Sequence, residues 1–163
     1  MYRKILVPMD GSKLSETVLP HAKEIAEAFK AEIVLLSVPI YPVFDPAAID
    51  PALIGSMYDG IRSEAMQYLQ RTSAPLKQAG LNVTLEMRDG PIADTILECA
   101  ERFQADLIAM STHGRGGMTR WLLGSVADRV VRGGKVPVLL IRPCLTDKHA
   151  SGTTNVTNIQ PAA

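Results

Sequence analysis

The chain lacks three features that would place it in a class at once: an excess of one charge, a cysteine framework and a long apolar run. Seventeen Lys and Arg balance seventeen Asp and Glu among 163 residues, so nothing attracts it generally to nucleic acid or to an anionic membrane. Cys99 and Cys144 fit no CxxC or zinc-ligand spacing, which favours reduced thiols and a cytoplasmic location. No apolar run approaches the ~20 residues of a membrane span, and Ile5 to Met9 is too short for a signal-peptide core.

Familiar nucleotide motifs are absent as well. The chain has no Gly-x4-Gly-Lys-Ser/Thr, and therefore no P-loop lysine. Gly114-Arg115-Gly116-Gly117 is not a GxGxxG fingerprint, which disfavours hydride chemistry on a dinucleotide. A single acid, Asp10, follows the first apolar run, whereas a receiver-type phosphoacceptor pocket needs a cluster of acids.

Short apolar runs without alternation recur along the chain. They are Ile5 to Val7, Ile33 to Leu36, Leu107 to Met110 and Val138 to Ile141. Such runs are typical of strands that are buried on both faces of a parallel sheet. Val83 to Met87 alternates instead, so we expect that strand near an edge of the sheet.

Helical patterns separate these runs. The predicted helices cover Leu14 to Phe29, Ile61 to Leu76, Ile92 to Phe103 and Ser125 to Gly133. A Gly11 turn and a Ser12 cap precede the first helix, and Gly60 and Pro75 trim or bend the second. In the last helix, Asp128 stands in a near capping-box position. Alternating strands and helices predict an α/β fold: an open parallel sheet with helices on both faces and right-handed crossovers.

Two segments fall outside this alternation. Pro39 to Asp59 carries four prolines and is long for a connection; it is a lid, a partner surface or a passive insertion, and the sequence leaves these three open. After Pro143 the composition shifts to Thr, Ser, Gly, Asn and Ala. We therefore expect one domain over residues 1–143 and a flexible tail over residues 144–163.

A loop of small residues between the fourth strand and the last helix carries the strongest functional signal. It begins Ser111-Thr112-His113-Gly114 and re-enters a helix at Gly124-Ser125. Glycines let backbone amides approach a ligand, and a helix N-terminus favours an anion. The pattern predicts a phosphate site built from the main chain, and hence a nucleotide ligand.

Two side chains near this loop invite a chemical role. Asp10 suits a ribose hydroxyl or a metal that rides on phosphates; its alternative role is to hold the turn ahead of Gly11. His113 has no Ser-His-Asp or Cys-His spacing, so a hydrogen bond that orders the loop is favoured over catalysis. In a parallel sheet, ligands bind beyond the carboxyl ends of the strands, where the strand order reverses. Both loops follow strand ends and open on that side.

Three segments resemble the universal stress protein A-like family, and the match covers roughly residues 2–143. The opening strand and turn are Lys4-Ile5-Leu6-Val7-Pro8-Met9-Asp10-Gly11-Ser12. The nucleotide signature is Ser111-Thr112-His113-Gly114-Arg115-Gly116-Gly117 with Leu122-Leu123-Gly124-Ser125-Val126-Ala127. The closing strand is Val136-Pro137-Val138-Leu139-Leu140-Ile141. The family's signature is Gly-x2-Gly-x9-Gly followed by Ser or Thr. Ser111 stands where that signature begins with glycine; its Cβ reduces the room for a ligand, while its hydroxyl can donate a hydrogen bond.

The resemblance implies a five-stranded sheet of order 3-2-1-4-5, similar to the adenine nucleotide alpha hydrolase fold. It also implies ATP, or AMP or ADP, with Mg²⁺ in a cleft between the first and fourth strands, and a homodimer joined through the last strand, Val136 to Ile141. The implied nucleotide-binding residues are Pro8, Asp10 and Val38 at adenine and ribose, Ser111, Thr112, His113, Gly114, Arg115, Gly116 and Gly117 around ribose and phosphates, and Gly124, Ser125 and Val126 at the phosphate tail.

The expected function is that of an ATP-binding regulator of the stress response. We expect little or no turnover and assign no catalytic residue, because no side chain in the pattern positions an attacking water. Two alternatives stay open: a slow nucleotide hydrolase or transferase that uses His113 and Asp10, and a nucleotide-free dimeric module that recruits an unknown protein partner through Pro39 to Asp59.

Overall fold

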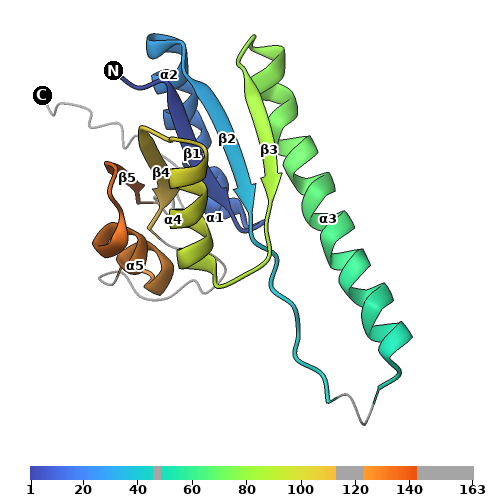
Figure 1. Ribbon diagram of the computed structural model, residues 1–163. Helices are drawn as coiled ribbons and strands as arrows, with labels where there is room; N and C mark the ends of the chain where they lie inside the picture. The colour runs from blue at the N-terminus through green and yellow to red at the C-terminus, as the bar shows by residue number, and fades with distance from the viewer. Residues whose placement is uncertain (46–48, 113–122, 143–163) are drawn as a thin grey trace, which may run out of the picture.

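The fold is a single five-stranded parallel sheet with helices on both faces (Figure 1). The computed structural model describes residues 1–45, 49–112 and 123–142. Its strands are β1 (Lys4–Met9), β2 (Glu32–Ser37), β3 (Val83–Met87), β4 (Leu107–Ser111) and β5 (Val138–Ile141). Their order is β3-β2-β1-β4-β5, so the predicted fold class and strand order are confirmed and β3 lies at an edge. The expected tail, residues 144–163, is outside the described part of the chain.

The sheet is central because its middle strands are apolar on both sides. In β1, Ile5 and Val7 pack into one hydrophobic cluster and Leu6 into the other, and all three are fully buried. The same alternation of faces runs along β2. Burial on both faces explains why these strands appear in the sequence as continuous apolar runs.

Within the described ranges, five helices cover the two faces. They are α1 (Lys13–Glu16), α2 (Leu19–Phe29), α3 (Pro51–Gln78), α4 (Ile92–Arg102) and α5 (Ser125–Gly133). The cores of α2 and α3 belong to one cluster, and those of α4 and α5 belong to the other. In Figure 1, α4 and α5 accordingly stand in front of the sheet and α2 behind it. The covering helices change from one face of the sheet to the other at β1, which pairs with β2 on one side and with β4 on the other.

The helical pattern after β1 forms two helices rather than the single predicted one. Gly11 turns the chain with φ +83°, and Ser12 caps α1 by accepting a hydrogen bond from the Ser15 amide, both as expected. The helix then stops at Glu16, and α2 begins at Leu19. Pro20 explains the break, because it has no N–H to bond the Glu16 carbonyl and its ring would clash there.

The segment 39–59 is only partly a loop. Asp50 caps α3 by accepting a hydrogen bond from the Ala52 amide at 2.9 Å, and Pro51 supplies the first helical position. The 28-residue helix then continues through Gly60 and Pro75, so the expected trimming at these residues was wrong. Its N-terminal half projects beyond the carboxyl ends of the strands (Figure 1).

Gly60 weakens α3 without serving a packing role. A Cβ built on it meets nothing within 4 Å, and glycine within a helix costs about 0.5–1 kcal/mol relative to alanine. We expect Gly60→Ala to raise the free energy of unfolding by about that amount in urea denaturation. Gly90→Ala is the matched control and should lower it, because Gly90 has φ +141° and its Cβ would lie 2.7 Å from the Thr95 hydroxyl. A destabilised Gly60→Ala protein would contradict the helix.

Candidate functional site

A cavity of about 700 Å³ opens at the carboxyl ends of β1, β2 and β4. Residues of α3, α4 and α5 complete its walls. Eight of the predicted site residues line it: Pro8, Asp10, Val38, Ser111, Thr112, Gly124, Ser125 and Val126. The remaining predicted residues are His113, Gly114, Arg115, Gly116 and Gly117, and they lie outside the part of the chain that the structure describes.

The loop between β4 and α5 is fixed at both ends. The Thr112 amide donates to the Ile141 carbonyl at 2.9 Å, which anchors the loop's start on β5. The Gly124 amide donates to the Thr112 carbonyl at 3.0 Å and so brings the loop's end back to its start. Residues that are twelve positions apart therefore lie side by side on the cavity wall.

The N-terminus of α5 faces the cavity, and no side chain of the described residues caps it. Gly124 is the N-cap residue, and its backbone carbonyl accepts the first helical bond from the Asp128 amide at 2.9 Å. Ser125 is thus the first helical residue and not the cap, and the predicted capping box does not form; Asp128 pairs instead with Arg132 at 3.0 Å. A helix start without a capping side chain leaves backbone N–H donors and a partial positive charge for an anion.

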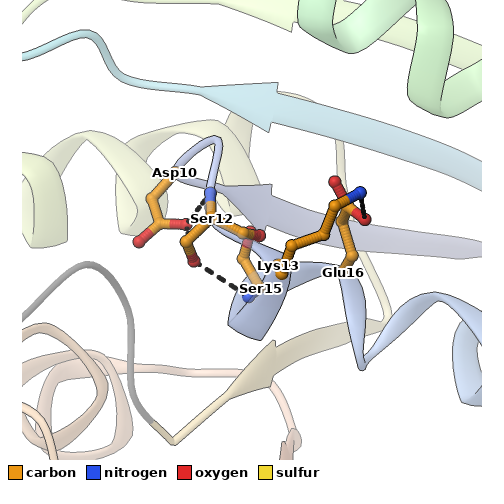
Figure 2. Close-up of polar contacts among 5 residues, drawn as sticks. All are labelled: Asp10, Ser12, Lys13, Ser15 and Glu16. Atoms are coloured by element: carbon orange, nitrogen blue, oxygen red, sulfur yellow. Dashed lines mark hydrogen bonds and ion pairs between the residues drawn. The ribbon is translucent and has the colours of Figure 1, made fainter. Parts of the chain in front are cut away.

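Asp10 lines the cavity from a tight turn after β1 (Figure 2). Its Oδ1 accepts hydrogen bonds from the Ser12 amide at 2.9 Å and the Ser12 hydroxyl at 2.6 Å. The Ser15 amide donates in turn to Ser12 Oγ at 3.1 Å. Lys13 and Glu16 pair with each other on the other side of the turn at 2.7 Å. The Asp10 carboxylate is therefore held in one orientation at the cavity wall.

The rest of the cavity is largely apolar. Leu36 and Val38 come from the end of β2, Ile92 and Ile96 from α4, and Met110 from β4. An apolar pocket with a few fixed polar groups is the usual form of a small-molecule site. Here the polar groups include the Asp10 turn and the α5 N-terminus, and α3 adds Glu64 and Arg71.

Comparison with known protein families assigns the chain to one of them. The model of the universal stress protein family matches residues 1–142. The chain belongs to the universal stress protein family. It is 36% identical to universal stress protein MJ0531 of Methanocaldococcus jannaschii, over 87% of this chain and 83% of that protein.

Solved structures of universal stress proteins share the fold. The structure of MJ0577 from the same organism superposes with a TM-score of 0.73 at 30% identity, covering 88% of this chain and 97% of that one. A universal stress protein in complex with cAMP superposes with a TM-score of 0.61 at 26% identity, covering 86% and 97% of the two chains.

In this universal stress protein, one wall of the cavity comes from a helix that the sequence did not assign to the site. Residues of α3 line it: Ile61, Glu64, Ala65, Tyr68 and Arg71. The helical spacing of Ile61 and Ala65 indicates a buried face of α3. It does not show that this face passes the carboxyl end of the sheet, because that depends on how the helix docks.

Tyr68 stands out on this wall. Its hydroxyl is buried beside Ser15 and Thr72 but has no hydrogen-bond partner among the described residues. Burial raises its pKa, and these two neighbours act in the opposite direction. A buried polar group without a partner costs stability.

We expect Tyr68→Phe to leave the free energy of unfolding unchanged or to raise it by up to about 1 kcal/mol, because it removes an unpaired hydroxyl and keeps the ring. Urea denaturation of the ligand-free protein measures this. Tyr58→Phe is the control and should lose a little stability, since the Tyr58 hydroxyl donates to the Pro42 carbonyl at 3.1 Å. A loss above 1 kcal/mol in Tyr68→Phe would show that the hydroxyl is bonded.

Proposed function

We propose that this universal stress protein binds an adenine nucleotide, ATP or the related AMP or ADP, in the cavity at the carboxyl end of the sheet. One observation carries the proposal: the eight described residues that the family resemblance assigns to a nucleotide lie around a single cavity, beside a helix N-terminus that no described side chain caps. A relative that has been solved in complex with cAMP supports the choice of an adenine ligand.

The placement of the nucleotide follows from the chemistry of the walls. The phosphates lie at Gly124, Ser125 and Val126, where the helix supplies backbone donors. The ribose lies toward the Asp10 carboxylate, a natural acceptor for hydroxyls. The base lies against Pro8 and Val38, on the apolar side.

Mg²⁺ fits this site as a companion of the phosphates. Within the described ranges, no three His, Cys, Asp or Glu side chains gather to hold a metal. Asp10 nevertheless places one carboxylate at the wall. Mg²⁺ commonly binds through one or two carboxylates and the substrate's phosphates, so Asp10 and the nucleotide would hold it together, and the ion would supply charge neutralisation.

A regulatory role with little or no turnover fits the groups that line the cavity. Phosphoryl transfer requires a group that orients the attacking nucleophile. The described wall offers backbone amides, the Asp10 carboxylate, whose Oδ1 already accepts two hydrogen bonds from Ser12, and the side chains of Glu64 and Arg71 on α3. Neither Glu64 nor Arg71 is among the residues that the family resemblance assigns to the nucleotide. Such a cradle suits binding and release of a signalling nucleotide by a cytoplasmic stress-response protein.

Calorimetric titration with ATP and with AMP, each with Mg²⁺, tests the site. We expect binding to the wild type and at least a tenfold weaker affinity for Gly124→Val, because the valine side chain would crowd the backbone donors at the start of α5. Gly55→Val is the matched control: a Cβ there meets nothing within 4 Å, so the heats should match the wild type. Unchanged heats for Gly124→Val would refute the site, and no heat from the wild type would refute the function.

We propose, second, that two copies associate through the last strand. β5 lies at the edge of the sheet and its residues are only partly buried, and an edge strand presents backbone groups to another chain. Among the helices of the described part, none is long and apolar enough to cross a membrane. Pairing of two β5 strands predicts that sedimentation equilibrium gives twice the 17.6 kDa mass of the chain. A monomer at micromolar concentration would contradict this interface.

A further inference from the structure

Three segments that border the cavity are tied together by one polar cluster, which we call the Tyr41 clasp (Tyr41, Arg62 and Asp89). The Tyr41 hydroxyl donates to Asp89 Oδ1 at 2.7 Å, and Arg62 Nε donates to the Tyr41 oxygen at 3.0 Å. Arg62 also forms an ion pair with Asp89. The Tyr41 hydrogen bond and the Arg62 charge hold the pKa of the Asp89 carboxyl below its usual value.

The clasp joins the connection after β2, the helix α3 and the turn after β3. Each clasp residue has a neighbour on the cavity wall: Ile40 precedes Tyr41, Ile61 precedes Arg62, and Ile92 follows Asp89 by three residues. These three isoleucines come from different segments and border the same cavity. The clasp therefore sets how closely the three segments approach one another.

Aromatic packing reinforces the clasp on the side of α3. The Arg62 guanidinium lies 5.9 Å from the centre of the Tyr41 ring, and the Tyr58 ring lies 4.7 Å from it. The Tyr58 hydroxyl donates to the Pro42 carbonyl. These contacts fix the connection against α3, although residues 39–45 form no helix or strand of their own.

The Asp89 side of the clasp is held by the backbone. The Arg88 amide donates to the Ser37 carbonyl at 3.1 Å, which extends the pairing of β2 and β3 up to the turn. Gly90 follows with φ +141°, and the Thr95 hydroxyl leaves no room for a Cβ at Gly90. The same hydroxyl donates to the Pro91 carbonyl. Asp89 is thus a fixed point to which Tyr41 and Arg62 attach.

We propose that the Tyr41 clasp is a positioning device for the nucleotide site: it holds the wall formed by residues 38–40 in the shape that receives the base. The inference rests on the proposed function. Arg62 and Asp89 are about half exposed, and an exposed ion pair contributes little stability by itself. The clasp instead affects nucleotide binding. A wall that is not ordered before the nucleotide arrives must be ordered by the nucleotide, and that ordering lowers affinity.

Affinity measurements on clasp variants test the proposal. We expect Arg62→Met and Asp89→Asn to weaken both ATP and AMP roughly three- to tenfold, as for the loss of one or two hydrogen bonds. The factor should be the same for both nucleotides, because the phosphate end is untouched. The double variant should bind about as weakly as either single one, since both break the same cluster.

The matched control is the ion pair of Lys135 with Glu101. It also joins distant segments at 2.6 Å, is exposed, and belongs to residues that do not line the cavity. Lys135→Met and Glu101→Gln should bind ATP and AMP as the wild type does. A general effect of deleting surface charge would appear in these variants too and would overturn the assignment to the clasp.

Hydrogen exchange separates positioning from a merely structural role. In the ligand-free Arg62→Met and Asp89→Asn proteins, amides of residues 38–45 should exchange faster than in the wild type, and saturating ATP should restore their protection. Wild-type affinity in both variants, with binding by the wild type intact, would overturn the clasp and leave the proposed function standing. A wild type that binds neither nucleotide would remove both.

Discussion

The pairing of β1 with β2 on one side and β4 on the other is the constraint on which the site depends. Ile5 and Leu6 stand opposite residues of both neighbouring strands and are fully buried. With right-handed crossovers, this central place of β1 sends the helices after β1 and β2 to one face and those after β3 and β4 to the other. Chains that leave neighbouring strands toward opposite faces leave a space between them at the strand ends, and the Asp10 turn and the loop closed by Thr112 and Gly124 border that space.

The strands, and the side of the sheet where the cavity lies, could be predicted because each depends on a local or periodic signal. Burial on both faces produces continuous apolar runs, and a glycine-rich segment ahead of a helix predicts a backbone-made anion site. The length of α3 could not be predicted in this way. Its projecting half leaves Leu53 and Met57 exposed and so carries no periodicity that burial would impose. The break before α2 reflects Pro20, whose steric effect on the preceding turn outweighs the helical spacing of its neighbours. Tyr68 lines the cavity because of the way α3 packs against the sheet, and the spacing of residues along one helix does not define that packing.

Asp10 shows why two readings of one residue need not compete. The sequence leaves it either as a turn residue or as a ligand for ribose or metal, and the structure has its Oδ1 bonded to Ser12 while the residue lines the cavity. Holding a carboxylate by its own turn removes rotamer freedom before any ligand arrives, and so reduces the entropy lost on binding. The structural role of Asp10 therefore prepares the binding role that we propose for it.

Two parts of the cavity wall are built on different principles, and this division suits the regulatory role that we propose. The part at which we propose that the phosphates bind consists of main chain held by strand pairing and by the start of α5, so its geometry is as stable as the fold itself. The part formed by residues 38–40 belongs to a connection without regular structure that is held by half-exposed side chains. By our proposal, a change in the Tyr41 clasp alters how much of the wall at residues 38–40 is ordered before the ligand binds. Affinity can therefore be adjusted at this wall without disturbing the main-chain part or the core. The regulatory role that we propose needs an affinity tuned to the nucleotide level more than it needs a maximal one, and the half-exposed clasp leaves room for such tuning.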